Sequence, residues 1–354
     1  MRRSKIYKLS LWKSILIIAM MLTLMTSVAY SFYHPAFIFN PSSVIITSEL
    51  PEAEDKLKIS ENDREEDPLV AYEEEQFNIV LLGFDRSESR IQAQNLFRPD
   101  TIIIAAVNFR TAEVSLLSIP RDSYVKISGS ETYDKINHAY AYGFLRAVEG
   151  EDPHQSGLQT TLSTIEDLLG GVPLHEYMAL DIDGGANIID IIGGLQYDVE
   201  FEMRIKSGKR EFTLEEGYQQ LDGNQFMGYV RYRSNQHGGD WGRIERQQKI
   251  LIALLKKLKS EGRLRDLEDI RRLADQYIET NLSIYQVATL AAFALRFNFA
   301  DINTFILDGQ GQLSYRDGQH TWYWVINEEK RVDTIKEIFG VTVEKVPSPE
   351  IPGS

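Results

Sequence analysis

The stretch VRYRSNQHGGDWGRIERQQ, residues 230–248, concentrates four arginines in a chain whose formal net charge is −14. If its first four residues are extended, Arg231 and Arg233 point to the same side, because side chains alternate along a strand. The apolar face with Val230 and Tyr232 would then meet a core. The pattern therefore predicts a short strand that presents two guanidinium groups together.

The second half of the stretch has the pattern of a helix start. Asp240 follows a glycine pair and can cap the helix, and Arg243, Arg246 and Gln247 then share one face. Helix N-termini attract anions, and the fork of a guanidinium suits phosphate oxygens. We therefore expect strand and helix arginines to meet at one strongly anionic group. The alternative is a solvated charged face in which Glu245 pairs locally.

Acidic and basic residues also alternate where apolar runs end or begin. Asp85 closes one run, Arg98 and Asp100 open the next, and Arg121 and Asp122 follow a third. Ligand sites of α/β sheets gather beyond strand ends. Simple ion pairs would explain these residues, but so would phosphate chemistry, in which carboxylates hold Mg²⁺ and arginines neutralise charge.

The elements that must position these residues are strands and helices in mixed order. Short apolar, β-branched runs predict strands, and apolar residues at helical spacing predict helices. The pattern of one region predicts a strand, a helix and a second strand, with glycines at the boundaries between them. Because there is no internal repeat and no long linker after residue 77, we expect one α/β domain. The predicted strands are 77–85, 100–109 and 113–122, the strand–helix–strand region is 176–202, and the helices are 157–171, 243–259, 264–277 and 284–297.

The N-terminus predicts export. A basic segment, 1–13, precedes an uncharged apolar run, 14–32, that is long enough to cross most of a membrane. The positive flank is expected to stay in the cytoplasm, which places the rest of the chain outside the cell as a single-pass membrane protein. A cleaved signal peptide is the alternative, because Ser27 and Ala29 are small residues at the positions a peptidase inspects.

Charge divides the remainder into a linker, a domain and a tail. Between Glu52 and Glu75, eleven carboxylates face three basic residues, with little apolar content. We expect 33–76 to be an acidic extracellular linker, 77–345 the folded domain, and 346–354 a disordered tail. The acidity of the chain therefore belongs largely to the linker.

Composition excludes several classes of site. There is no cysteine, so disulfides and thiolate metal sites are impossible, and the six histidines show no zinc spacing. Neither a Walker A loop nor a dinucleotide glycine fingerprint is present, so we expect no nucleotide. No helix-turn-helix pattern or basic stripe indicates nucleic-acid binding.

A series of motifs, in order, resembles the LytR-CpsA-Psr family of cell-wall enzymes: LLGFD, FRPDTIII, LLSIPRDSYV, YDKINHAYAYG, GGVPLHEYMALDIDG, IIDIIGGLQYDVE, EGYQQLDGNQFMGYVRYR and GDWGRIERQQ. The resemblance covers roughly residues 77–250. It implies an α/β/α sandwich with a central mixed sheet and a hydrophobic pocket for a polyprenyl chain. It also implies a phosphotransferase that moves an anionic glycopolymer from a polyprenyl-pyrophosphate carrier onto peptidoglycan.

The resemblance also implies roles for individual residues. Asp85 and Asp100 match the carboxylates that hold Mg²⁺, for which Mn²⁺ is an alternative, and Asp122 would act on the acceptor hydroxyl or orient Arg121. Asp240 has a supporting role. The catalytic set is Arg121, Asp122, Arg231, Arg233 and Arg243, and the pyrophosphate-binding set is Arg98, Arg121, Lys135, Arg231, Arg233, Arg243 and Gln247.

Two other functions remain open at this point. A membrane-anchored binder of wall polymers or lipids, acting as a regulator of the cell envelope, needs the arginines but not Asp85 and Asp100. A pyrophosphatase that only hydrolyses the carrier needs both groups. Only the transferase needs a glycan acceptor, so the acceptor is what separates these readings.

Overall fold

The computed structural model describes residues 76–84, 97–207, 210–260, 277–283, 286, 289–290, 293–294, 297–316, 319–347 and 350–351. The predicted basic segment, membrane span and all but the last residue of the linker lie outside this part of the chain, and so does Asp85. Within the described residues, no helix combines the length and apolar character needed to cross a membrane.

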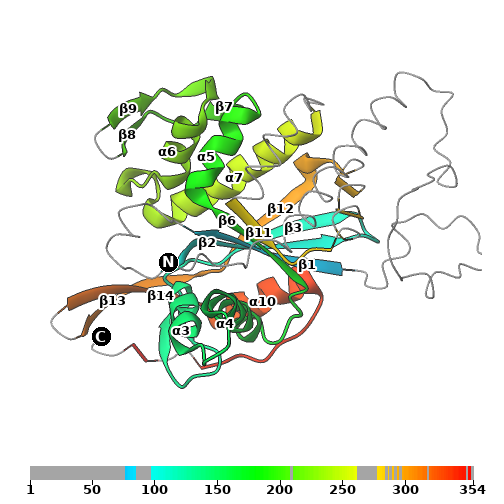
Figure 1. Cartoon of the computed structure of the whole chain (residues 1–354), viewed down its shortest axis with the longest axis vertical. Coiled ribbons are helices and arrows are strands. Elements are labelled where there is room, and N and C mark those ends of the chain that lie inside the picture. Colours follow the sequence, from blue (N-terminus) through cyan, green and yellow to red (C-terminus); the bar gives the residue numbers. More distant parts are fainter. Residues whose placement is uncertain are drawn as a thin grey trace, which may run out of the picture.

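A mixed sheet forms the centre of the fold (Figure 1). β1 runs parallel to β6 and antiparallel to β2, while β3 is antiparallel to β2 and parallel to β12. The described part of this sheet has six strands, in the order β11 (Ile278–Thr280), β6 (Glu176–Asp181), β1 (Gln76–Phe84), β2 (Pro99–Asn108), β3 (Glu113–Ser118) and β12 (Ile302–Ile306). The three strands predicted from apolar runs are confirmed as β1, β2 and β3.

Helices cover both faces of the sheet (Figure 1). On one side lie α3 (Ala139–Arg146), α4 (Pro153–Leu168) and α10 (Glu328–Phe339); on the other lie α5 (Ile182–Ile191), α6 (Gly223–Arg231) and α7 (Gly239–Ser260). Leu82 and Ile104 of the sheet pack with Tyr140, Ile165 and Phe339 in the largest hydrophobic core cluster. The predicted α/β fold with a central mixed sheet is confirmed.

A second core cluster joins α6 and α7 to short strands: β7 (Leu195–Val199), β8 (Met203–Ser207), β9 (Arg210–Leu214) and β10 (Gly217–Leu221). β7 and α5 confirm the predicted strand–helix–strand region together with β6, and α4 and α7 confirm two predicted helices. The predicted helix 264–277 lies outside the described residues apart from Tyr277, and 284–297 is described at only a few positions.

The prediction of an extended run at residues 230–233 is wrong. Arg231 is the last residue of α6, and Tyr232 is its C-cap. The helix starts upstream at a capping box, in which Asp222 accepts from the Gln225 backbone and Gln225 accepts from the Asp222 backbone. Once this helix forms, it includes Val230 and Arg231, the first half of the alternating pattern that suggested a strand.

The remaining described elements are 3₁₀ turns and two-stranded ribbons. The turns are η3 (Ile136–His138), η4 (Asn235–His237) and η5 (Phe299–Asp301); the ribbons pair β4 (Tyr124–Lys126) with β5 (Tyr133–Lys135) and β13 (Gly309–Arg316) with β14 (Gln319–Ile326). The β13–β14 hairpin extends beyond the sheet on the side where β1 and β3 end (Figure 1). This places it beside the strand ends that carry the predicted site.

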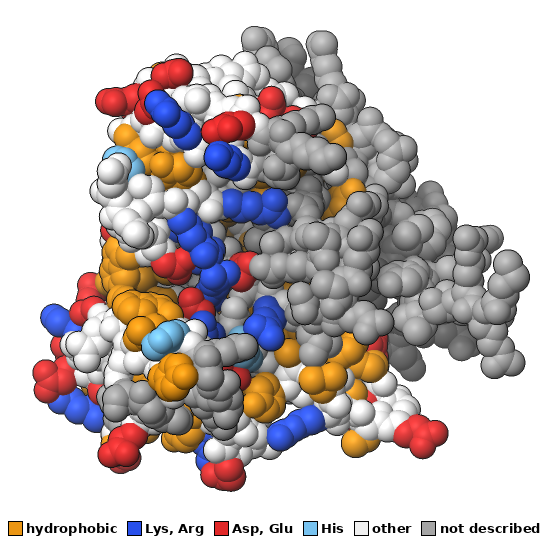
Figure 2. All heavy atoms as spheres, turned by 90° about the vertical axis from the view of Figure 1, so that its left-hand side faces the viewer, with side chains coloured by type: hydrophobic (Ala, Val, Ile, Leu, Met, Phe, Trp, Pro, Cys, Tyr) orange, Lys and Arg blue, Asp and Glu red, His pale blue; other side chains and the backbone are white. Residues whose placement is uncertain are grey.

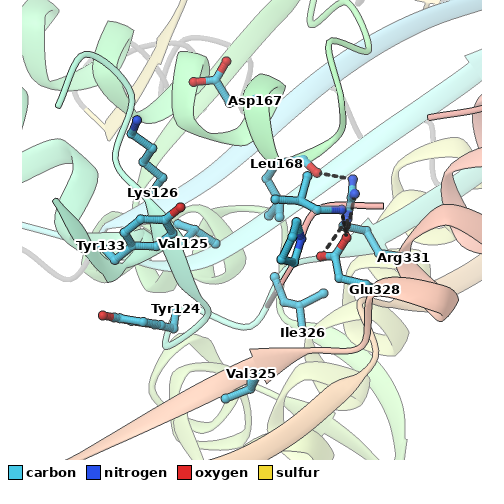
Figure 3. Close-up of a pocket in the computed structure, with 12 residues that line it drawn as sticks. Tyr124, Val125, Lys126, Tyr133, Asp167, Leu168, Val325, Ile326, Glu328 and Arg331 are labelled. Carbon is cyan, nitrogen blue, oxygen red and sulfur yellow. Dashed lines mark hydrogen bonds and ion pairs between the residues drawn. The ribbon is translucent and has the colours of Figure 1, made fainter. Parts of the chain in front are cut away.

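Arg331 of α10 is a buried cation that joins three segments. Its guanidinium donates to both Glu328 carboxylate oxygens at 2.8 to 3.0 Å and to the carbonyl oxygens of Leu168 and Glu344 at 2.8 Å. Figure 3 shows the Arg331–Glu328 pair at one side of a pocket, opposite Tyr124 and Tyr133 of the β4–β5 ribbon. Arg331 therefore fixes α10 against the end of α4 and the C-terminal segment.

That segment was expected to become a disordered tail from residue 346. In the described residues, the Val346 backbone donates to Glu328 at 2.9 Å, and Ile351 is buried. Residues 348–349 and 352–354 lie outside the described part of the chain.

Replacing Arg331 by methionine tests this junction. The substitution keeps much of the volume but leaves the Glu328 carboxylate and two carbonyl oxygens without their donor, so we expect a loss of about 3–5 kcal/mol in the free energy of unfolding. Equilibrium urea unfolding measures it. Lys345→Met, which removes an exposed lysine paired with Glu329, is the matched control and should change little. Equal, small effects in both variants would contradict the account.

Candidate active site

The site forms where β2 begins and β3 ends. The two strands are antiparallel, and the Ile119 backbone donates to Ile102 at 3.0 Å, so the residues after β3 lie beside the start of β2. Arg121 then pairs through Nη1 with Oδ1 of Asp100. The predicted meeting of strand-end arginines and carboxylates is present in the structure.

A tight turn holds Arg121 in this position. The backbone N–H and hydroxyl of Ser123 both donate to the Pro120 carbonyl, at 2.9 and 2.6 Å, and the Asn137 backbone donates to the Arg121 carbonyl at 3.2 Å. Asp122 accepts from Lys135 Nζ at 2.7 Å and lies 3.7 Å from Arg121 Nε. Asp122 thus joins the Arg121 turn to Lys135 at the end of β5.

The start of α7 closes over the same place. Arg243, whose side chain is only 4% exposed, donates through Nε and Nη2 to the two Asp240 oxygens, both at 3.0 Å, and through Nη1 to the Asp100 carbonyl at 3.4 Å. Arg233 reaches Asp240 as well, at 3.1 Å. α7 begins at Gly239, so Asp240 lies in the first turn and not at the predicted cap position, and its carboxylate binds arginines.

The pKa values reflect this crowding of charge. Burial and repulsion from Arg243 and Arg121 lower the pKa of Arg233, against attraction to Asp240 and Asp100. Burial also acts to lower the pKa of Arg121, but attraction to Asp100, Asp122 and Asp240 outweighs it and raises the value. The other two guanidinium groups therefore disfavour the charge on Arg233, and the carboxylates oppose this effect.

A fourth arginine of the site, Arg98, is held by a pair of side-chain contacts that the sequence did not suggest. Arg98 Nη1 contacts His138 Nε2 at 2.6 Å, and His138 Nδ1 contacts Asp134 at 2.8 Å. Since a guanidinium can only donate, His138 Nε2 accepts in this contact, and the other ring nitrogen faces the Asp134 carboxylate. The nearest sequence signal is the i, i+4 spacing of Asp134 and His138.

Two of these arginines retain donor capacity for a ligand. The Nε atoms of Arg98 and Arg121 are buried and have no hydrogen-bond partner among the described residues. A buried donor without a partner costs about 1–3 kcal/mol, and an anionic oxygen would remove that cost. Figure 2 shows Lys and Arg side chains gathered along the middle of this face, with acidic and hydrophobic side chains beside them.

Three predicted site residues are not placed in this cluster by the described contacts. Arg231 is exposed at the end of α6, and Gln247 is buried with its amide 3.4 Å from the Val230 carbonyl, a contact that joins α7 to α6. Asp85 lies outside the described residues. Their roles in binding stay predictions.

Asp100 is the described residue that could contribute to a metal site. Within the described ranges, no group of three or more His, Asp or Glu side chains could hold a metal ion. Mg²⁺ needs only one or two carboxylates when phosphate oxygens complete its shell, so a carboxylate beside buried arginine donors fits that ion. Asp100 thus meets the requirement for one protein ligand.

Comparison with known proteins identifies the family. Residues 43–340 match the LytR_cpsA_psr family model. The chain belongs to this family. It is 30% identical over 237 residues to an Enterococcus faecalis protein named polyisoprenyl-teichoic acid–peptidoglycan teichoic acid transferase TagU, covering 67% of this chain and 71% of the relative. The match to the family model begins at residue 43, within the predicted linker.

Relatives of longer coverage and solved structures agree. The Oceanobacillus iheyensis protein of the same name is 29% identical over 286 residues, covering 79% of this chain and 81% of the relative. The crystal structure of B. subtilis TagV is 28% identical, with a TM-score of 0.60, covering 76% of this chain and 98% of that one. A structure described as TagT bound to LIIa-WTA is 26% identical, with a TM-score of 0.56, covering 78% and 93%. Family membership and fold are therefore shown together.

The Asp240 carboxylate gives the site a testable pH dependence. Burial acts to raise its pKa, but Arg243, Arg233 and Arg121 outweigh burial and hold it below the ordinary value. A lowered folded-state pKa stabilises the fold above the unfolded-state value of about 4, and this contribution is lost as the pH falls through the folded-state pKa. Urea unfolding should therefore show a higher free energy of unfolding for wild type than for Asp240→Asn at pH near 6. The difference between the two free energies should shrink towards about pH 2. A difference independent of pH would contradict the assignment.

Proposed function

We propose that this chain transfers an anionic glycopolymer from a polyprenyl-pyrophosphate carrier to a sugar hydroxyl of peptidoglycan and releases polyprenyl phosphate. The observation that carries the proposal is the convergence of Arg121, Arg243 and Arg233 beside Asp100, with the buried Nε of Arg121 making no hydrogen bond to any described residue. The names of the relatives, which are teichoic acid transferases, support the same substrate class.

Pyrophosphate suits this cluster in charge and shape. Guanidinium groups bind phosphate oxygens through paired N–H donors, and several are needed to match the charge of two linked phosphates. Arg98 would contribute from the start of β2, where His138 holds its Nη1 and Nε remains available. Lys135 adds a positive charge beside Asp122.

The reaction is a displacement at phosphorus. An acceptor hydroxyl oxygen forms a bond to the phosphorus nearer the glycopolymer, the bond from that phosphorus to the bridging oxygen breaks to release polyprenyl phosphate, and the hydroxyl proton passes to a carboxylate of the site or to water. The arginines neutralise charge on the non-bridging and leaving oxygens, so catalysis comes mainly from positioning and electrostatics. The activated carrier makes a nucleotide unnecessary.

Asp122 has two possible roles, which the Lys135 contact helps to define. One oxygen accepts from Lys135 at 2.7 Å, and the other faces Arg121 Nε at 3.7 Å. A carboxylate held by two cations is a weak base but a firm positioning group for Arg121. Asp122 could still accept the acceptor proton, and we retain both roles.

We include Mg²⁺ in the proposal, with Mn²⁺ as a substitute. Asp100, with Asp85 as the predicted second ligand, would hold the ion, which would stabilise charge on the leaving phosphate. Asp100 also pairs with Arg121, so the carboxylate would link ion and arginine.

The proposed location is the outer face of the cell membrane. Support comes from the apolar run 14–32 after a basic segment and from the lipid carrier, which cannot leave the bilayer. An uncleaved anchor would keep the site near that substrate, whereas a cleaved signal peptide would release it.

The function is tested with the full chain in detergent or liposomes, Mg²⁺, a radiolabelled polyprenyl-pyrophosphate glycan and peptidoglycan oligomers. Wild type should transfer label to the peptidoglycan oligomers. Arg121→Ala should lower kcat by about 10²–10³-fold, because a charge-stabilising donor is lost. Arg204→Ala is the matched control, because Arg204 is an exposed arginine of β8 that pairs with Glu202. Label released only to water would indicate a pyrophosphatase, and binding without turnover a wall-polymer receptor.

The metal is tested separately. EDTA should abolish transfer and added Mg²⁺ should restore it, while Asp100→Asn should require more Mg²⁺ for half-maximal rate, because a neutral amide binds the ion less well than a carboxylate. Binding of the labelled carrier, measured by filter retention, reports whether Asp100→Asn still binds substrate. Full activity of wild type in EDTA would remove the metal from the mechanism.

A further inference from the structure

The β13–β14 hairpin carries large side chains in solvent. Trp322 is 52% exposed, Tyr315 is 56% exposed, and Leu313 is 51% exposed. Leu313 pairs with Trp322 across the ribbon, and Tyr315 pairs with His320, so all four lie on one face. Exposed aromatic residues gathered on one element indicate a contact surface.

The backbone of the hairpin is shaped to present these rings. A Cβ at Gly311 would lie 1.9 Å from the Trp322 ring, so that ring lies directly over the glycine. A Cβ at Gly309 would lie 2.7 Å from Trp324 Nε1, which itself donates to the Leu307 carbonyl at 3.2 Å. Glycine at both positions thus lets tryptophan rings lie against the backbone.

The same face continues into the candidate active site. Trp324, two residues after Trp322 on the same side of β14, donates its backbone N–H to the Asp122 carbonyl at 2.9 Å. Its ring is 5.5 Å from that of Trp241, in the first turn of α7 beside Asp240. With a rise of about 3.4 Å per residue, Trp322 lies roughly 7 Å beyond Trp324. We name Trp241, Trp324, Trp322 and Tyr315 the aromatic strip.

The chemistry of the hairpin points to a neutral, ring-shaped ligand. On the face of the hairpin that carries the rings, the described positions are Gly309, Gly311, Leu313, Tyr315, His320, Trp322, Trp324 and Ile326, and none of these is a lysine, arginine, aspartate or glutamate. The negative face of an aromatic ring attracts the C–H groups of a neutral sugar ring that stacks on it. An anionic glycopolymer would find no lysine or arginine at these positions to match its phosphates.

We propose that the aromatic strip binds the glycan strand of the peptidoglycan acceptor. Sugar rings stack on Trp322 and Tyr315, and the strand leads towards Trp324, which places an acceptor hydroxyl beside Asp122 and the arginines. The proposal rests on the proposed transferase function and names where its second substrate binds. The hairpin is thus a specificity element, separate from the charge-stabilising groups.

Binding is measured first, without donor, so that it does not depend on turnover. The full chain in detergent micelles is titrated calorimetrically with undecorated peptidoglycan oligosaccharides. Trp322→Ala and Tyr315→Ala should each weaken binding about tenfold or more, as expected for a central aromatic contact, and Trp322→Phe should retain most of it. Gly311→Val keeps the tryptophan but displaces its ring and should behave like Trp322→Ala. Tyr218→Ala, a 75% exposed tyrosine on β10, is the matched control.

Kinetics then separate the acceptor from the donor. Trp322→Ala should raise KM for the acceptor about tenfold and leave KM for the polyprenyl-pyrophosphate donor unchanged. Failure of wild type to transfer would refute the proposed function, whereas oligosaccharide binding that is equal in wild type and Trp322→Ala would refute the aromatic strip. Three other outcomes would also overturn the proposal. If Trp322→Ala changed only KM for the donor, the strip would bind the anionic polymer, and if it changed only liposome binding, the strip would bind lipid. If it changed only the particle size in light scattering, the strip would bind a second copy of the chain.

Discussion

The structure of the site depends on a balance between like-charged guanidinium groups and the aspartates that hold them. Burial lowers the pKa of Arg233, repulsion from Arg243 and Arg121 lowers it further, and attraction to Asp240 and Asp100 opposes both. Such an arrangement costs free energy unless each charge is paired and hydrogen-bonded. The turn after β3, the start of β2 and the first turn of α7 must therefore all be fixed before the cluster can form.

The surrounding fold supplies that rigidity. The antiparallel register of β2 and β3 places Arg121 beside Asp100, and the buried helix α7 brings Arg243 across the strand ends. What remains is a concentration of positive charge with buried N–H groups still able to donate. An incoming anion would relieve repulsion and satisfy these donors at once, which is why we connect this cluster with a pyrophosphate group.

Local patterns predicted the parts of the chain in which one physical signal dominates. The β-branched runs of β1 to β3 are buried on a central sheet, and the periodic apolar residues of α4 and α7 face cores. At Arg231 two local patterns predicted different secondary structures, and the structure follows the longer pattern. A four-residue alternation suggested a strand, whereas the capping box at Asp222 starts a helix that continues through Arg231.

Long-range contacts could not be predicted from the chain. His138 binds Arg98, which is forty residues away, and Trp324 reaches the backbone of Asp122 only because β14 runs beside the turn after β3. Nothing in the local sequence specifies such partners, since tertiary packing brings them together. The same holds for Gln247, whose spacing predicted a ligand but whose described contact is a backbone carbonyl of α6.

The most direct test of the charge cluster is a calorimetric titration of the full chain with inorganic pyrophosphate, at low ionic strength and with inorganic phosphate as comparison. The account predicts that pyrophosphate binds more tightly than phosphate and that Arg243→Gln weakens binding by about tenfold or more, because a hydrogen bond to a charged group contributes about 1.5–3 kcal/mol. Equal binding of both anions, or pyrophosphate binding that Arg243→Gln leaves unchanged, would contradict it.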